Sequence, residues 1–269
     1  MLLAALAWGG ATAGGEAPSV SPPVDRFPGA AASYLVSVGG RVLWARAPDT
    51  ARPPASLTKV MTALVLLTGD WDPAAPVTVS LRAARATGSR LGLVAGERLH
   101  AGDLLAATLV ASANDACLAL AEHAAGSEPA FVARMNARAV ALGLAATHFD
   151  NACGHDAPGQ RASARDLLRL ARLAMAHPEV RRLAGLEETF ATSSSGRTIR
   201  VKATNALLGR LPGATGLKTG YTPGAGRCAV ATAERGGVEV VVVLLDARER
   251  WWSAAGLVEA AFDEARTGG

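Results

Sequence analysis

Lysine is scarce in this chain of 269 residues: three lysines occur, against 24 arginines. Arginine therefore supplies the ordinary surface charge. We expect lysine at positions where the side chain must give up a proton, because a buried amine can do so and a guanidinium cannot. Two of the three lysines stand in short motifs, Ser56-Leu-Thr-Lys59 and Lys218-Thr-Gly220, which makes these two segments candidates for chemistry.

Cysteine is equally scarce, which excludes a small disulfide-stapled scaffold. We expect Cys117, which lies in an apolar helical run, to be a buried thiol. A bridge between Cys153 and Cys228 would be allowed in an oxidising compartment. The sequence alone does not establish that bridge.

Aromatic residues, long apolar runs and metal-ligand clusters are scarce or absent as well. Aromatics make up 4% of the chain and no basic run is interleaved with them, so the net charge of +4 indicates a solvated arginine-rich surface and no nucleic-acid partner. No apolar run beyond the N-terminus reaches the ~18–20 residues of a membrane span, so a membrane anchor is not evident. The five histidines form no His-Glu-x-x-His or similar cluster, so we predict no metal and no cofactor. A loop hydrogen bond is expected of the pair His155-Asp156.

The N-terminus has the composition of a targeting segment. Residues 1–8 are apolar, and Ala11-Thr-Ala13 resembles a cleavage site, although the usual basic segment is missing. We expect residues 1–28 to be a signal-peptide remnant and linker, and residues 29–269 to form one domain that is exported to the periplasm or cell-wall space. We expect no C-terminal β domain or anchor after it. The alternative for the first residues is a plain Ala/Gly tail.

The pattern of apolar residues predicts strands at both ends of the chain and helices between them. Segments 32–38 and 41–46 alternate around two glycines as a hairpin does, and the valine run in 238–246 is typical of a central strand. Trp251 and Trp252 are expected in the core, on the apolar stripe of a closing helix. Further strands are predicted at 216–221 and 228–233, and helices at 56–67, 103–111, 113–125, 128–142, 164–176 and 249–265. The expected fold class is α/β (α+β), an antiparallel sheet built from N- and C-terminal strands with a helical subdomain between them and the catalytic cleft between sheet and helices.

Three motifs together predict a serine acyl-transfer site. Ser56 and Lys59 share one helix face, so the lysine amine can hydrogen-bond the serine hydroxyl and act as its base once burial and a second cation, Lys218, lower its pKa. Ser112 can relay a proton to the leaving nitrogen, and Asn114 can hold the substrate amide. Each motif alone has an ordinary structural explanation, such as a helix cap for the serine. The three motifs occur in the expected order and contain two of the three lysines. This combination favours a catalytic role over the separate structural explanations.

The third motif supplies the substrate-binding groups. Lys218 and Thr219 suit a terminal carboxylate, and Gly220 and Tyr221 continue the same strand. Backbone N–H groups of Ser56 and Tyr221 are predicted to form an oxyanion hole.

The chain resembles the low-molecular-mass penicillin-binding proteins, the serine D-alanyl-D-alanine carboxypeptidases. The resemblance runs from about residue 30 to 262 and includes Ala55–Leu64, Ser112–Glu122 and Gly216–Thr222. It implies a β-lactamase-like fold, a Ser56 nucleophile with Lys59 as base, peptidoglycan stem peptides as substrates and β-lactams as covalent inhibitors. Two departures stand out. An arginine that some relatives carry before the third motif is Thr204 here, and the loop from Asn151 to Asp156 lacks the usual Asn-Pro-x-Gly form, so we assign it no role.

Two related activities compete with a carboxypeptidase. A D,D-endopeptidase would use the same motifs, which cannot separate the two. A class A β-lactamase would need a Glu-x-x-x-Asn loop between the second and third motifs, and none occurs there. An intact motif set also disfavours a degenerate wall-binding or scaffold protein.

Overall fold

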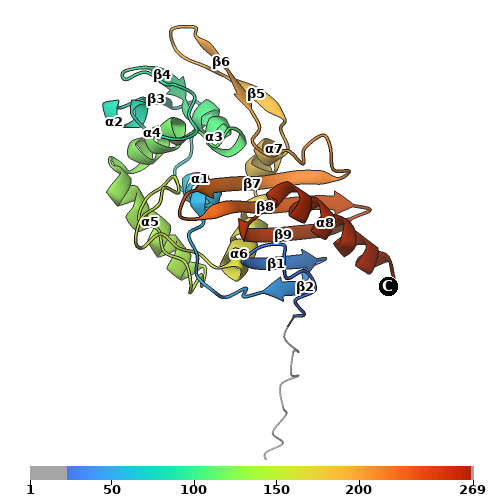
Figure 1. Ribbon diagram of the computed structural model, residues 1–269. Coiled ribbons are helices and arrows are strands. Elements are labelled where there is room, and N and C mark those ends of the chain that lie inside the picture. Colours follow the sequence, from blue (N-terminus) through green and yellow to red (C-terminus); the bar gives the residue numbers. More distant parts are fainter. Residues whose placement is uncertain (1–22, 268–269) are drawn as a thin grey trace, which may run out of the picture.

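The valine run near the C-terminus forms the middle strand of the sheet. In the computed structural model, which describes residues 23–267, β9 (Val238–Ala247) lies between β1 (Ser33–Val38) and β8 (Gly226–Arg235). The order is β2-β1-β9-β8-β7, and all four pairings are antiparallel (Figure 1). The expected sheet of N- and C-terminal strands is confirmed. The expected signal remnant at residues 1–22 lies outside the described residues.

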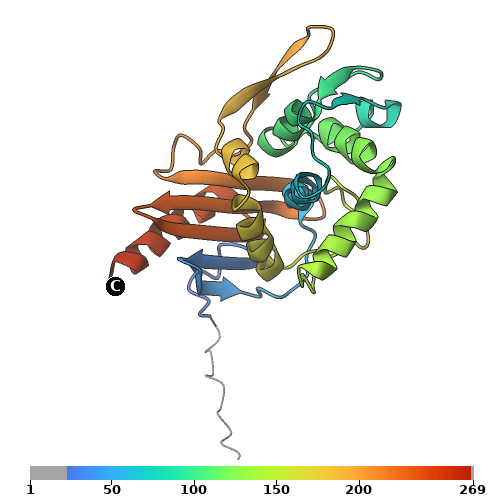
Figure 2. The same cartoon turned by 180° about the vertical axis from the view of Figure 1, so that it is seen from behind.

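Both faces of this sheet are buried, which explains why β9 is apolar at successive positions. Val241 and Val243 point into the core shared with the helical region, while Val240 and Val242 point into a second core under α8 (Arg250–Thr267). Successive side chains of a strand point to opposite faces, so a strand that is covered twice loses its polar alternation. Figures 1 and 2 show α8 on one face and α6 (Ala164–Met175) and α7 (Pro178–Ala184) on the other.

The predicted hairpin and the long helices are confirmed, and several short elements were not predicted. The missed strands are three to five residues long and mostly exposed, so they carry little hydrophobic pattern. Among them, β5 and β6 form a hairpin that projects from the body of the molecule (Figure 1). The remaining elements are β2 (Arg41–Arg46), η1 (Ala55–Thr58), α1 (Lys59–Leu67), β3 (Pro76–Thr78), α2 (Leu81–Ala84), β4 (Arg98–His100), α3 (Ala101–Val110), α4 (Asn114–Ala125), α5 (Glu128–Ala141), β5 (Glu188–Thr192), β6 (Thr198–Lys202) and β7 (Ala214–Thr222).

The closing helix buries a narrower stripe than the sequence predicted. Ala254, Val258 and Phe262 are buried at i, i+4 spacing, but Trp252 is 81% exposed. Two residues turn a helix by about 200°, which places Trp252 on the side opposite Ala254. The expectation that Trp252 belongs to the core was therefore wrong, and Trp251 is only partly buried.

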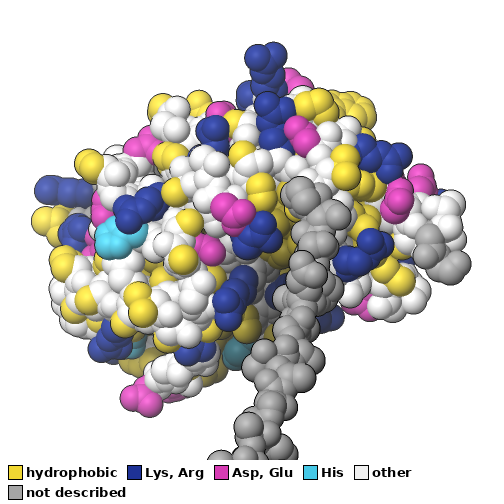
Figure 3. Space-filling model, turned by 90° about the horizontal axis from the view of Figure 1, so that it is seen from below, with side chains coloured by type: hydrophobic (Ala, Val, Ile, Leu, Met, Phe, Trp, Pro, Cys, Tyr) yellow, Lys and Arg dark blue, Asp and Glu magenta, His cyan; other side chains and the backbone are white. Residues whose placement is uncertain are grey.

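On the face seen in Figure 3, basic side chains lie among acidic and apolar ones and do not gather in one patch. Within residues 23–267, no helix combines the length and the apolar character needed to cross a membrane.

Candidate active site

The edge strand β7 lies directly against the 3-10 turn η1, and the first and third motifs meet there. β7 carries Lys218 and Gly220, and η1 carries Ser56. A Cβ at Gly220 would lie 2.9 Å from Ser56 N, closer than real side chains approach. Glycine is therefore required for the strand to approach the turn so closely.

The turn that holds Ser56 is tightly fixed. Its first residue, Ala55, has φ +49°, a region that residues with a Cβ occupy rarely and at a cost. The Thr58 hydroxyl donates to Ala55 O at 2.9 Å, and Gln160 Nε2 donates to Thr58 Oγ1 at 2.8 Å. The helix that Ser56 was expected to open starts instead at Lys59, after this turn. Ser56 makes no helix cap, so its hydroxyl is available to the neighbouring lysine.

Lys59 is completely buried and lies at the centre of the candidate site. Its Nζ is 3.0 Å from Ser56 Oγ, 2.6 Å from Asn114 Oδ1 and 2.5 Å from Cys153 O. Burial, and secondly the charge on Lys218, hold the pKa of Lys59 well below its ordinary value. A neutral amine has two N–H groups and one lone pair. Because the two carbonyl oxygens can only accept, they take both N–H groups, and the lone pair is left for the Ser56 hydroxyl.

Lys218 is buried as well, but its surroundings differ. Burial, and secondly the charge of Arg250, lower the pKa of Lys218 to about 7, and its Nζ donates to Thr219 O at 3.0 Å. Arg250 itself donates to Gly220 O at 2.7 Å and to Cys228 O at 3.2 Å. It begins α8, far from the three motifs in sequence, and no sequence signal marked it.

The second motif lies at the turn between α3 and α4. Ser112 is buried there with φ +60°, a further strained position beside the site. Asn114 is anchored twice, by its backbone N–H donating to Ser89 O at 2.7 Å and by Nδ2 donating to Thr87 O at 2.6 Å. The structure thus brings Asn114 against Lys59 and places Ser112 two residues before it.

Further along β7, the remaining predicted residues lie beside these groups. Thr219 Oγ1 is 2.8 Å from Thr204 Oγ1, so the threonine in place of an arginine forms a hydrogen-bonded hydroxyl pair. The side chain of Tyr221 is 63% exposed at the end of the strand.

The loop from Asn151 to Asp156, to which the motifs assigned no role, packs against the candidate site. Cys153 O contacts Lys59, and a Cβ at Gly154 would lie only 2.0 Å from Ala55 O. The backbone of the loop therefore packs on the turn that holds the serine. The loop hydrogen bond expected of the pair His155-Asp156 is confirmed, since the Asp156 carboxylate accepts from Thr222 Oγ1 and Gly224 N at 2.5 and 2.9 Å.

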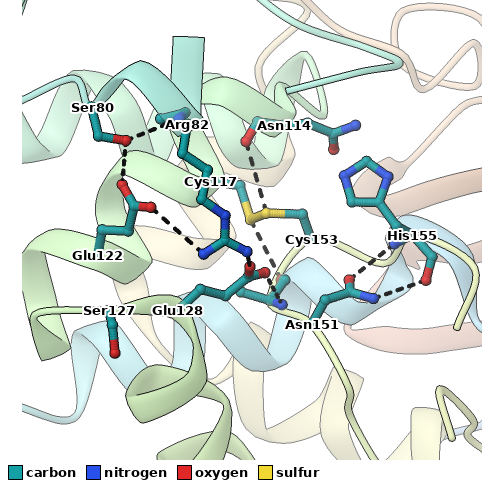
Figure 4. A network of polar contacts seen from close by, with 12 residues as sticks. Ser80, Arg82, Asn114, Cys117, Glu122, Ser127, Glu128, Asn151, Cys153 and His155 are labelled. Atoms are coloured by element: carbon teal, nitrogen blue, oxygen red, sulfur yellow. Dashed lines mark hydrogen bonds and ion pairs between the residues drawn. A yellow bond between two sulfur atoms is a disulfide. The ribbon is translucent and has the colours of Figure 1, made fainter. Parts of the chain in front are cut away.

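The cysteine expectations are corrected. Cys117 is no free thiol but forms a disulfide with Cys153 (Figure 4). Cys228 is free and buried. The Cα atoms of the bridge are 6.0 Å apart, within the usual range. Closing 36 residues of sequence contributes about 2–4 kcal/mol to stability. The sequence could not choose this pair, because three cysteines allow three single bridges.

Among residues 23–267, no group of three or more His, Cys, Asp or Glu side chains is placed to hold a metal ion.

The sequence is similar to those of known proteins. The family model of D-alanyl-D-alanine carboxypeptidase matches residues 24–249. The carboxypeptidase DacF of Bacillus subtilis is 32% identical over 85% of this chain and 60% of its own length, and DacB2 of Mycobacterium tuberculosis is 35% identical over 85% and 78%. The chain thus spans about three fifths of DacF.

Solved structures agree with the family match. The Streptomyces K15 DD-transpeptidase superposes with a TM-score of 0.82 at 29% identity, covering 91% of this chain and all of its own. A D-alanyl-D-alanine carboxypeptidase from Mycobacterium tuberculosis superposes with a TM-score of 0.81 at 32% identity, covering 91% and 94%. The expected β-lactamase-like fold is confirmed by these two matches.

Gly154→Ala should destabilise the protein more than an equally strained glycine elsewhere. Both Gly154 and Gly96 have φ near +85°, but only the Gly154 Cβ would collide with backbone, while nothing lies within 4 Å of a Cβ at Gly96. A side chain in the left-handed backbone region costs about 1–2 kcal/mol, and overpacking adds about 1–3 kcal/mol. Urea unfolding of Gly154→Ala and Gly96→Ala measures the difference. Equal losses in the two variants would contradict the tight packing of the loop on the turn.

Proposed function

Because the chain belongs to the D-alanyl-D-alanine carboxypeptidase family, we propose that it is a serine carboxypeptidase that removes the terminal D-alanine of peptidoglycan stem peptides. The observation that carries this proposal is the buried Lys59 amine, whose two carbonyl partners leave its lone pair for Ser56. A serine hydroxyl becomes a competent nucleophile only when such a base takes its proton.

The proposed reaction proceeds in two steps through an ester on Ser56. Lys59 takes the hydroxyl proton while Ser56 Oγ attacks the carbonyl carbon of the D-Ala-D-Ala bond. The N–H groups of Ser56 and Tyr221 stabilise the oxyanion. As the C–N bond breaks, the proton passes from Lys59 through the hydroxyl of Ser112 to the leaving nitrogen, and free D-alanine departs. Water then hydrolyses the ester and restores the serine.

Substrate binding is proposed along the free edge of β7. An edge strand presents unpaired N–H and C=O groups to an extended peptide, and β7 brings these groups beside Ser56. Lys218, with the hydroxyl pair of Thr219 and Thr204, then suits the terminal carboxylate. Asn114 would hold the amide of the preceding residue.

Transpeptidation is a second candidate activity, favoured by the superposition on the K15 DD-transpeptidase over that chain's whole length. Transfer to an amine and transfer to water share the acylation step and differ in what attacks the ester. A D,D-endopeptidase differs in substrate, because it cuts internal cross-links that lack a free carboxylate at the leaving residue.

Export to the extracytoplasmic space is part of the proposal. The disulfide between Cys117 and Cys153 supports it, because disulfides persist in oxidising compartments. The apolar N-terminal residues, with their signal-like cleavage motif, support the same location.

Penicillin should form a covalent adduct on Ser56 that persists for minutes or longer, because no Glu-x-x-x-Asn loop supplies a water-activating glutamate. Intact-mass analysis with peptide mapping locates the adduct, and Ser56→Ala should abolish both the adduct and D-alanine release without unfolding the protein. Labelling that persists in the variant would refute Ser56 as the nucleophile. Rapid penicillin turnover without D-alanine release would instead indicate a β-lactamase.

Lys59→Arg should slow acylation at least about a hundredfold, since removing a general base typically costs 10²–10⁴ in rate. The variant keeps the positive charge but loses the ability to give up a proton. Stopped-flow acylation with a fluorescent penicillin measures the rate. Lys202→Arg, on the exposed strand β6, is the matched control, and near-normal acylation in Lys59→Arg would show that Lys59 is not the base.

Amidation of the terminal D-alanine should cripple hydrolysis, because the buried Lys218 cation would then lack its anionic partner. The preference for the free acid should shrink as pH rises through the lowered pKa of Lys218, where the cation is lost. Rates on matched free-acid and amidated peptides across pH measure this. Equal rates on the two peptides would favour an endopeptidase.

A further inference from the structure

The Cys117–Cys153 disulfide joins the two segments that hold the amine of Lys59. Cys117 lies in the first turn of α4, three residues after Asn114, and Cys153 belongs to the loop from Asn151 to Asp156. Asn114 Oδ1 and Cys153 O are the two carbonyl acceptors of Lys59 Nζ. The bridge therefore fixes the distance between the two groups that orient the lysine lone pair.

Figure 4 shows that the other contacts of this loop are non-covalent. Glu128 Oε1 accepts from Ala152 N at 3.0 Å, and Arg82 pairs with Glu128 and Glu122. The Asn151 side chain accepts from the N–H groups of the two residues after Cys153, at 2.7 and 3.0 Å. These contacts hold the residues on either side of Cys153, whereas the disulfide acts at Cys153 itself, the residue whose carbonyl meets Lys59.

Loss of the bond would displace that carbonyl. Bonded sulfurs lie about 2 Å apart, while non-bonded atoms of this size need about 3.5–4 Å. Both cysteines are buried, at 0% and 2% exposure, so two thiols could separate only if α4 or the loop moved. We expect the loop to move, because the first eight residues of α4, which include Cys117, are all buried and the loop has no regular structure.

We propose that the Cys117–Cys153 disulfide is a positioning element of the active site, which holds the Cys153 carbonyl where it keeps the Lys59 amine dry and aims its lone pair at Ser56. The proposal rests on the function proposed above for Ser56 and Lys59. It is distinct from a purely stabilising role, because it predicts an effect on the base itself.

The expected consequence is a change in the proton affinity of Lys59. The charged and titratable groups around it are Lys218 of β7, His155 of the same loop and Glu128 of α5 behind that loop. None of these is removed when the bond is absent. Admission of water beside the amine weakens the desolvation that disfavours its charged form, so the pKa of Lys59 should rise towards its ordinary value. Fewer enzyme molecules then carry a free base at neutral pH.

The chain allows this to be measured directly, since it contains only three lysines. In protein labelled with ¹³C-lysine, the Lys59 resonance is identified by its loss in Lys59→Arg, and its pH titration gives the pKa. In Cys117→Ala/Cys153→Ala we expect the midpoint to rise by about one unit or more, and acylation by penicillin at neutral pH to fall about tenfold or more. The acidic limb of the pH–rate profile should move to higher pH by the same amount. Cys228→Ala, which removes the buried free thiol, is the control and should match the wild type.

The outcomes separate the two proposals. An unchanged or lowered Lys59 midpoint in the double variant would overturn the positioning role, even if the melting temperature fell, because a merely structural bond would change stability alone. If the double variant does not fold, the same titration on wild-type protein treated with a phosphine reductant decides the question by the same criterion. A wild type that penicillin fails to acylate would refute the proposed function, while the Lys59 titration would still test the effect of the bond on the amine.

Discussion

The site depends on the burial of one amine. Lys59 is removed from water, and its two N–H groups meet carbonyl oxygens on two different segments, α4 and the loop around Cys153. A buried polar group without partners would cost several kcal/mol, so the amine is stable in this place only when both segments supply their carbonyl oxygens.

The two motif lysines share a residue type but differ in environment. Burial and the neighbouring Lys218 cation favour the neutral form of Lys59, while Lys218 lies beside Arg250 and donates to the backbone oxygen of Thr219. Because each pKa depends on burial and on the next charge, one cleft can hold a base and a carboxylate-binding cation a short distance apart. Arginine could serve neither as a base nor as a group whose charge is adjustable. The proposed roles would therefore explain why both motif positions carry lysine in a chain that mostly uses arginine.

The position of the site between two layers links fold and chemistry. β7 is an edge strand, so its outer backbone groups are available to a peptide, and Gly220 lets that strand lie against Ser56. The middle strand β9 is buried on both faces and anchors α8, which in turn supplies Arg250. The sheet therefore carries the proposed substrate-binding edge, and the helical region carries the proposed nucleophile and base.

The sequence by itself determined what is local in this protein. The spacing of Ser56 and Lys59 predicted that a hydroxyl and an amine lie within reach of each other. The apolar run of β9 predicted a central strand. Both predictions were possible because periodicity and spacing are properties of neighbouring residues. Tertiary structure alone decided which carbonyl meets Lys59, which cysteines pair, that Arg250 reaches β7 and that Trp252 faces solvent. Every residue carries the same backbone carbonyl, so the identity of residue 153 does not predict that its oxygen binds an amine 94 residues away in the sequence. Such contacts are set by how the chain packs.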